Sequence, residues 1–429
     1  RGGAIRSGSQ IRVGQTPHEK RSRSESRISV AVMRVKFMPR SIWVALPARI
    51  LIFMRMLLAG LLGLVVLGAC SATGASVEDE APVETPDFVW QESTPAAVGL
   101  DPVKLKAEID AAKKHKSACF VVVKDGQLVS ENYWRGETAE TNRVAFSVTK
   151  SIASTLVGIA QADGDLKITD KASEYIPEWR GTPSEDITIR NLLANDSGRE
   201  WTPSLDYEGL FSTNNMSEFA VELGQMAEPG DVWAYNNAAI QTLDRILFAA
   251  TGNRPYEMAR DRIFEPLGMN HTRIASDSAA QSTNLAAGML STCMDLARFG
   301  LMIEQGGEWE GEQIVPKEWI EEATGSPSQK LNAAYGYLWW LNRKGEIREP
   351  MDAGSTLPPR VVVGRNQEVP GAPRDMFAAV GFGGQIVMID PGSRTIVVRL
   401  GEPNVDGQIS TYGFRDAAKV VTRALDSGA

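Results

Sequence analysis

The sequence predicts an α+β fold in which one antiparallel sheet is assembled from both ends of the chain. Two predicted strands follow the first helix of the folded part, and three more precede the last helix. Between them, from about residue 150 to 370, apolar residues recur mostly at helical spacing. Because strands and helices do not alternate regularly, a doubly wound sheet is disfavoured. We therefore expect a sheet with flanking helices, an inserted helical subdomain, and a site in the cleft between them.

The N-terminal elements are a helix and a hairpin. Asp101-Pro102 is typical of a helix start, with an N-cap followed by proline at the first helical position. Residues 118–123 and 127–133 are rich in β-branched and aromatic residues and flank Asp125-Gly126. This dipeptide favours a two-residue hairpin turn, so the two segments are predicted to pair.

The central elements are predicted to be helices. Residues 148–160 place Val148, Ile152, Leu156 and Ile159 on one helical face. Residues 342–375 are rich in Gly, Pro and Arg without a period and predict a surface loop. Further helical spacing predicts helices at 188–194, 238–250, 256–263 and 292–304.

The C-terminal elements are three strands and a helix. We predict strands at 376–380, 385–389 and 395–400, with a turn at residues 390–393 between the last two. Residues 413–425 predict a closing helix.

The first 70 residues differ from the rest. They contain ten Arg and two Lys against two Glu, and the run to about residue 40 shows no period. We interpret residues 1–53 as an over-extended translation start or, alternatively, a disordered basic tail. Residues 54–70 combine Arg55, an apolar core and the ending Leu-Gly-Ala-Cys, which is typical of a lipoprotein signal with Cys70 as the lipidated residue. An ordinary secretory signal or a single membrane anchor is the alternative.

The segment that follows predicts a tethered, exported domain. Residues 71–92 begin with a stretch rich in Ser, Ala, Glu and Pro and predict a flexible tether to a domain at 93–428. After residue 70 the chain has 33 basic and 51 acidic residues, so we expect no nucleic-acid partner. Cys119 and Cys293 are expected to be two buried small apolar residues rather than a disulfide. No metal set or cofactor motif is found, and the oligomeric state is not readable.

Ser147 and Lys150 open the first central helix. Three residues apart on a helix, their side chains share a face and can meet. A lysine whose pKa is lowered can take the serine proton, and backbone N–H groups at a helix start can stabilise an oxyanion. Taken alone, the Ser-x-x-Lys spacing is common and equally fits an N-terminal serine with a solvated lysine.

Two further motifs support this site. Tyr235-Asn236-Asn237 precedes a helical run, and a phenol beside a lysine is expected to ionise more easily and relay a proton. Asn237 can bridge Lys150 and a substrate carbonyl. The third motif, residues 381–385 (GFGGQ), lies between two predicted strands, and Gly383 or Gly384 is predicted to complete the oxyanion and substrate contacts. A buried tyrosine with a turn asparagine, and a plain β-bulge or tight hairpin, are the alternatives.

These motifs, in this order, resemble those of the serine β-lactamase and penicillin-binding-protein family. The likeness runs from about residue 93 to 425 and is greatest to the class C-like branch, with its esterases, D-alanyl-D-alanine peptidases and 6-aminohexanoate-oligomer hydrolases. It is supported by ITIRNLLANDSGRE (187–200), PLGM (266–269), LSTCMDLARFG (290–300) and YGYLWWL (335–341). The resemblance implies an acylated Ser147, with Lys150 as base and Tyr235 as proton relay.

One departure narrows the expected substrate. Penicillin-recognising members carry Lys-Thr-Gly or His-Thr-Gly as the third motif, where this chain has Gly381-Phe382-Gly383. We therefore expect a serine hydrolase for small esters or linear amides, held at the membrane by a lipid anchor. D-Alanyl-D-alanine carboxypeptidase or β-lactamase activity, and a surface receptor without turnover, are the alternatives. Trp201, Trp339 and Trp340 are candidates for an apolar acyl pocket.

Overall fold

The computed structural model describes residues 88–277, 281–325, 327, 330–348, 362–405 and 408–425. The basic extension (1–53), the signal segment (54–70) with Cys70, and most of the tether lie outside these residues. Within the described residues, no helix combines the length and hydropathy needed to cross a membrane.

The main sheet contains strands from both ends of the chain, as predicted. Its strands pair in the order β2-β1-β11-β10-β9-β8, and every pairing is antiparallel. Strand β1 is the second strand of this order and pairs with β2 on one side and with β11 on the other, where Val121 lies opposite Val398. Their bounds are β1 Ser117–Lys124, β2 Gln127–Tyr133, β8 Trp340–Leu341, β9 Phe377–Gly381, β10 Gln385–Asp390 and β11 Thr395–Gly401.

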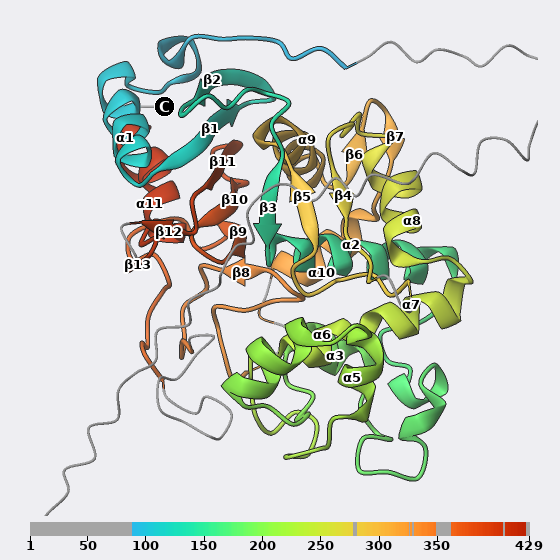
Figure 1. Ribbon diagram of the computed structural model, residues 1–429. Coiled ribbons are helices and arrows are strands. Elements are labelled where there is room, and N and C mark those ends of the chain that lie inside the picture. Colours follow the sequence, from blue (N-terminus) through green and yellow to red (C-terminus); the bar gives the residue numbers. More distant parts are fainter. Residues whose placement is uncertain are drawn as a thin grey trace, which may run out of the picture. The chain divides into compact units, whose positions relative to one another are not determined.

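Helices cover both faces of this sheet (Figure 1). On one face, α1 (Pro102–Lys114), α11 (Phe414–Ala417) and the turn η6 (Val420–Ala424) enclose a core with Leu105 and Phe120. On the other face, α2 (Val148–Asp163) and α9 (Cys293–Glu304) enclose the larger core, which includes Val121 and Ile152. The helix predicted at 413–425 is thus divided into a short α-helix and a π-helical turn.

The helical subdomain is inserted between the two halves of the sheet, as predicted (Figure 1). The predicted helix at 238–250 is divided near Thr242, whose hydroxyl donates to the Ala239 carbonyl. The helix predicted at 256–263 becomes a short α-helix followed by a π-turn. The helices and turns here are η2 Ala172–Glu174, η3 Pro177–Trp179, α3 Ile189–Ala194, η4 Ser204–Gly209, α4 Leu210–Ser212, α5 Met216–Glu222, α6 Asn237–Gln241, α7 Leu243–Thr251, α8 Pro255–Ala259 and η5 Arg260–Phe264.

Several short strands were not predicted from the sequence. A second sheet has the order β3-β5-β4 and delivers the chain directly into α2. These strands are too short to show the period-two pattern that identifies a strand. The remaining short elements are η1 Pro95–Val98, β3 Arg143–Phe146, β4 Arg273–Ile274, β5 Met289–Ser291, β6 Glu308–Trp309, β7 Glu312–Gln313, α10 Lys317–Gly325, β12 Asn404–Val405 and β13 Gln408–Ile409.

The predicted loop at 342–375 is confirmed where the structure describes it. Residues 342–348 and 362–375 contain no helix or strand, only a single bridge between Ile347 and Gly364. Asn342, which is buried, accepts from the Val369 N–H, so this part of the loop is held to the end of β8.

The prediction for the two cysteines was wrong in one respect. Cys119 lies in a buried strand and Cys293 starts a buried helix, as expected, but their sulfur atoms form a disulfide. The two residues are 174 positions apart, and only the packing of α9 on β1 brings them together. The bond therefore joins the N-terminal hairpin to the helix behind it.

Candidate active site

Ser147 lies at the junction between β3 and α2. Strand β3 ends at Phe146, which has a left-handed backbone with φ 49°, and α2 begins at Val148. A bulky residue rarely adopts this conformation, and such strain clusters at functional sites. The turn places the serine at the N-terminus of a long buried helix, where free backbone N–H groups can stabilise negative charge.

Lys150 is brought into contact with Ser147, as the three-residue spacing predicted. Its Nζ lies 3.0 Å from Ser147 Oγ and 2.7 Å from Asn237 Oδ1. A third hydrogen bond goes to the carbonyl of Ala286. The side chain is 1% exposed, so the ammonium has exchanged water for three protein oxygens.

Burial changes the protonation of this lysine. Desolvation lowers the pKa of Lys150 to about 7, although the nearby Asp206 carboxylate opposes the change. A large fraction of the side chain is therefore neutral near neutral pH and able to accept a proton. This is the condition that a lysine base requires.

Asp206 belongs to the same hydrogen-bonded group of side chains but was not identified from the sequence. It is 1% exposed and lies in the π-helical turn η4. Its carboxylate accepts from Asn237 Nδ2 at 2.7 Å and from the Ala238 N–H at 2.9 Å. Burial raises the pKa of Asp206 to about 6. A continuous chain of hydrogen bonds thus links Ser147, Lys150, Asn237 and Asp206.

Tyr235 lies beside the same lysine. The Lys150 Nζ is 5.0 Å from the centre of the Tyr235 ring, and the hydroxyl interacts with the Ser147 side chain. The next residue, Asn236, caps α6 by accepting from the Ala239 N–H, which fixes the chain between Tyr235 and Asn237. The structure therefore brings Ser147, Lys150, Tyr235 and Asn237 together.

The protonation expected for Tyr235 differs from the prediction. Burial raises the pKa of its phenol well above the usual value, so the lysine does not make ionisation easier. Because Lys150 is largely neutral, it provides little positive charge to stabilise a phenolate. The Tyr235 phenol is consequently protonated at neutral pH.

The glycine-rich third motif forms the turn between β9 and β10. A β-carbon added to Gly381 would lie 2.2 Å from the Ala145 carbonyl oxygen and 3.2 Å from the Ser147 nitrogen, so this glycine is the one beside the nucleophile. Gly383 and Gly384 have φ values of 71° and 82°. A β-carbon added to Gly383 would meet Pro403, and one added to Gly384 would meet Tyr412. The glycine that approaches the Ser147 nitrogen is thus Gly381, whereas the sequence predicted the oxyanion and substrate contacts at Gly383 or Gly384.

Aromatic side chains pack against Phe146 and Tyr235, two neighbours of Ser147. The Phe382 ring is 45% exposed and meets the Phe146 ring edge-on at 5.7 Å. Partly exposed Trp340 stacks on Tyr235 at 5.9 Å. Trp201 and Trp339 are both buried, so of the three tryptophans considered only Trp340 remains a candidate for the acyl pocket.

The backbone carbonyl of Ala286 accepts a hydrogen bond from Lys150, and neighbouring residues fix the position of this carbonyl. Gln241 Oε1 accepts from the N–H groups of Leu285 and Ala286, which orients the carbonyl that Lys150 contacts. A backbone contribution leaves no side-chain signature, so the sequence could not reveal it. Within the described residues, no group of three or more His, Cys, Asp and Glu is arranged to hold a metal ion.

Comparisons with known proteins show the family of this chain. A family model described as Beta-lactamase matches residues 104–412. The 6-aminohexanoate-dimer hydrolase of Paenarthrobacter ureafaciens is 22% identical over 358 residues, covering 78% of this chain and 86% of that protein.

Solved structures show the same fold. The octameric penicillin-binding protein homologue from Pyrococcus abyssi has a TM-score of 0.55 at 21% identity, covering 75% of this chain and 77% of its own. D-alanine carboxypeptidase AmpC from Burkholderia cenocepacia has a TM-score of 0.51 at 19% identity, covering 74% and 97%. Since the family match spans well over half of the sequence and the Ser147 and Lys150 motif falls within it, the chain belongs to the β-lactamase family of serine hydrolases.

Proposed function

We propose that this protein hydrolyses small esters or linear amides through a covalent acyl-enzyme on Ser147. The observation that carries the proposal is the 3.0 Å contact between Ser147 Oγ and the buried Lys150 amine, whose pKa is lowered to about 7. A nucleophile in hydrogen-bond reach of a largely neutral base is the arrangement that covalent catalysis needs.

Acylation follows from this arrangement. Lys150 Nζ accepts the Ser147 proton while Oγ attacks the substrate carbonyl carbon, and the carbonyl oxygen becomes an oxyanion. We assign its stabilisation to the N–H groups of Ser147 and Phe382, because Phe382 directly follows Gly381, where an added β-carbon would lie 3.2 Å from the Ser147 nitrogen. As the tetrahedral intermediate collapses, the neutral Tyr235 hydroxyl protonates the leaving oxygen or nitrogen and regains a proton from Lys150.

Deacylation uses the same groups in reverse. A water molecule gives its proton to the base and attacks the acyl carbon, and the released Ser147 oxygen is reprotonated. The acid is then free to leave, and Ser147, Lys150 and Tyr235 return to their starting protonation states.

The third motif supports neutral, apolar substrates. Gly381-Phe382-Gly383 offers neither a cation nor a hydroxyl to bind a carboxylate, and the exposed Phe382 ring contacts Phe146, the residue before Ser147. We therefore rank small esters and linear amides above D-alanyl-D-alanine stems, and those above β-lactams.

Active-site labelling tests the proposal. A fluorophosphonate followed by peptide mapping should modify Ser147 alone, and turnover of p-nitrophenyl acetate should vanish in Ser147→Ala and fall steeply in Tyr235→Phe. Label on another residue, or no label, would reject the assignment. Labelling without turnover would instead support the surface receptor.

We further propose that the protein is exported and anchored through a lipid on Cys70. The motif before Cys70 supports this, and so does the Cys119–Cys293 disulfide, because such bonds persist in oxidising compartments. Metabolic labelling with an alkyne-tagged palmitate should mark the wild type and not Cys70→Ala. Equal labelling of the two proteins would refute the anchor.

A further inference from the structure

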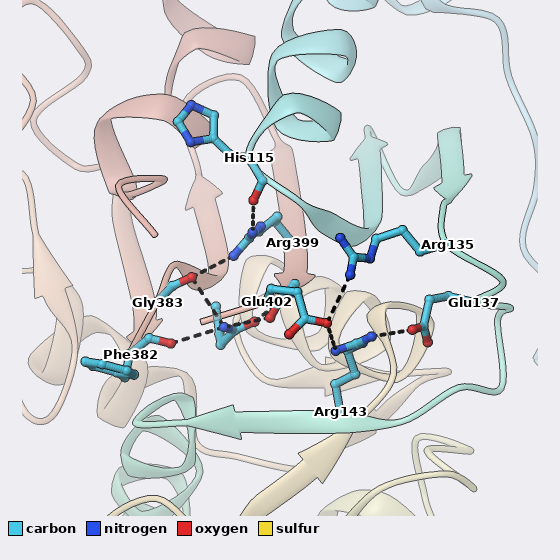
Figure 2. A network of polar contacts seen from close by, with 10 residues as sticks. His115, Arg135, Glu137, Arg143, Phe382, Gly383, Arg399 and Glu402 are labelled. Carbon is cyan, nitrogen blue, oxygen red and sulfur yellow. Dashed lines mark hydrogen bonds and ion pairs between the residues drawn. The ribbon is translucent and has the colours of Figure 1, made fainter. Parts of the chain in front are cut away.

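A buried arginine holds the glycine-rich turn beside the active site. Arg399 lies in β11 and has no exposed surface, and its guanidinium faces the turn at Phe382 and Gly383 (Figure 2). Its Nη1 donates to the Gly383 and Gly384 carbonyls at 2.8 and 2.9 Å. The same turn follows Gly381, where an added β-carbon would lie 3.2 Å from the Ser147 nitrogen.

The other side of the guanidinium is fixed as firmly. Nε donates to Ser117 Oγ at 2.8 Å, and Nη2 donates to the His115 carbonyl at 2.9 Å (Figure 2). The guanidinium also lies over the Tyr412 ring at 5.2 Å. Among its described hydrogen-bond partners there is no carboxylate. The cation is therefore held by neutral oxygens, and four of its contacts set its position independently of any ion pair.

Gln385 holds the remaining carbonyl of the turn. Its Nε2 donates to the Phe382 carbonyl at 3.1 Å and reaches the Gly383 carbonyl at 3.4 Å. Its Oε1 accepts from the Gly401 N–H at 2.8 Å, which ties the amide to β11. All three carbonyls of residues 382–384 thus accept hydrogen bonds from Arg399 or Gln385.

This arrangement follows from the backbone of the turn. Gly383 and Gly384 both have positive φ, and their carbonyls accept hydrogen bonds from the Arg399 side chain. Buried carbonyls without donors are costly, and an arginine supplies several N–H groups from one rigid plane. A lysine has no such planar fork and cannot reach all of these oxygens with fixed geometry.

The nucleophile's own strand is tied to the same region. Glu402, which follows β11, binds Arg143 of β3 at 3.1 Å and Arg135 at 3.7 Å (Figure 2). Arg143 also binds Glu137. Because β3 leads directly into Ser147, the strand before the nucleophile and the turn opposite it are both anchored at the C-terminal end of β11.

We propose that Arg399 is a positioning residue for acyl transfer, which holds the 382–384 turn so that the Phe382 N–H can bind the same oxyanion as the Ser147 N–H. Arg399 does not touch the reacting atoms and acts through the turn. The inference rests on the proposed function, since the oxyanion of an acyl transfer is the group that these two N–H groups would bind.

The test compares Arg399→Met and Arg399→Lys with the wild type. Relaxation of the turn should lower kcat for p-nitrophenyl acetate by between about tenfold and a hundredfold in Arg399→Met, with KM changed by less than about threefold. The maximal rate of Ser147 phosphonylation should fall by a similar factor, because that adduct also needs the oxyanion contacts. Arg399→Lys should be intermediate, and it serves as the test if the methionine variant does not fold.

A second buried arginine provides the control. Arg199 is 3% exposed and likewise donates to a serine hydroxyl and to backbone carbonyls, those of Ala220 and Val221. Arg199→Met should lower the thermal midpoint as Arg399→Met does without the selective loss of kcat. Equal loss of kcat in the two variants, or wild-type kcat in a folded Arg399 variant, would overturn the proposal.

The two proposals fail in different ways. If Ser147 of the wild type is not phosphonylated, the proposed function is rejected. If the wild type is labelled and the folded Arg399→Met protein is labelled at the same rate, only the positioning role is rejected.

Discussion

At the scale of single residues, the proposed mechanism depends on the protonation state of Lys150, because only the neutral amine can accept the Ser147 proton. The amine is enclosed by oxygens of Ser147, Asn237 and Ala286, and burial still lowers its pKa to about 7. In the proposed mechanism the neutral form is the base, so activity should fall as the pH drops and Lys150 becomes protonated. A lysine with an ordinary pKa would instead remain protonated throughout the neutral range.

The pH dependence of acylation should therefore have an acidic limb near pH 7. Below about pH 7 the protonated fraction of Lys150 grows, and kcat/KM for p-nitrophenyl acetate should fall about tenfold for each further pH unit, with a plateau above it. Initial rates corrected for spontaneous ester hydrolysis would measure this. A flat profile between about pH 5 and pH 8 would contradict the role of Lys150 as base.

Asp206 should control the position of that limb. Its carboxylate raises the pKa of Lys150, so Asp206→Asn should move the limb to lower pH. The variant also loses one hydrogen bond to Asn237 or Ala238, and we expect kcat at the plateau to fall about tenfold.

A matched variant separates these effects from general destabilisation. Asp295 is equally buried and binds the His271 N–H and the Thr272 hydroxyl, but it is no partner of Lys150. Asp295→Asn should leave the limb in place. An Asp206→Asn profile whose limb stays in place, or moves to higher pH, would rule out the electrostatic role.

At the scale of secondary structure, the end of β9 requires a glycine for reasons of space. The β-carbon of Gly381→Ala would lie 2.2 Å from the Ala145 carbonyl oxygen, so β9 must move away from the nucleophile. Because displacements of about 1 Å can cost about a hundredfold in rate, kcat should fall by about that factor. Gly392→Ala, in the next hairpin, meets nothing closer than 3.7 Å and should retain activity. Wild-type kcat in Gly381→Ala would refute this account.

The same scale shows what could be predicted from the sequence. Ser147 and Lys150 are three residues apart at the start of one helix, and Tyr235 and Asn237 flank a helix cap, so local patterns were sufficient to select them as candidates, and the structure brings them together. Asp206, Ala286 and Arg399 reach the site only through folding, and the backbone of a π-turn or a carbonyl leaves no side-chain pattern. The choice of Gly381 over Gly383 and Gly384 likewise depends on which side of the turn faces Ser147.

At the scale of the whole molecule, the Cys119–Cys293 disulfide joins the sheet to α9. Closing a loop of 174 residues restricts the unfolded chain, and the chain-entropy model gives a stabilisation of about 5 kcal/mol as an upper value. Reduction should therefore lower the thermal midpoint of the wild type. Differential scanning calorimetry with and without dithiothreitol would measure it.

The double variant Cys119→Ala/Cys293→Ala is the control for reduction. It should unfold at a lower temperature than the oxidised wild type and be insensitive to dithiothreitol. A wild-type midpoint that does not change on reduction would show that the bond does not stabilise the fold.

The sheet order also has a consequence for biosynthesis. Strand β11 lies between β1 and β10. The main sheet therefore cannot form completely until β11 is present and Val398 pairs with Val121. During translation Val121 is synthesised long before Val398. Until β11 has been made, the edge of β1 that faces β11 has no strand partner. Nascent or prematurely terminated chains that end before β11 should accordingly have no hydrolase activity, even though they contain Ser147 and Tyr235.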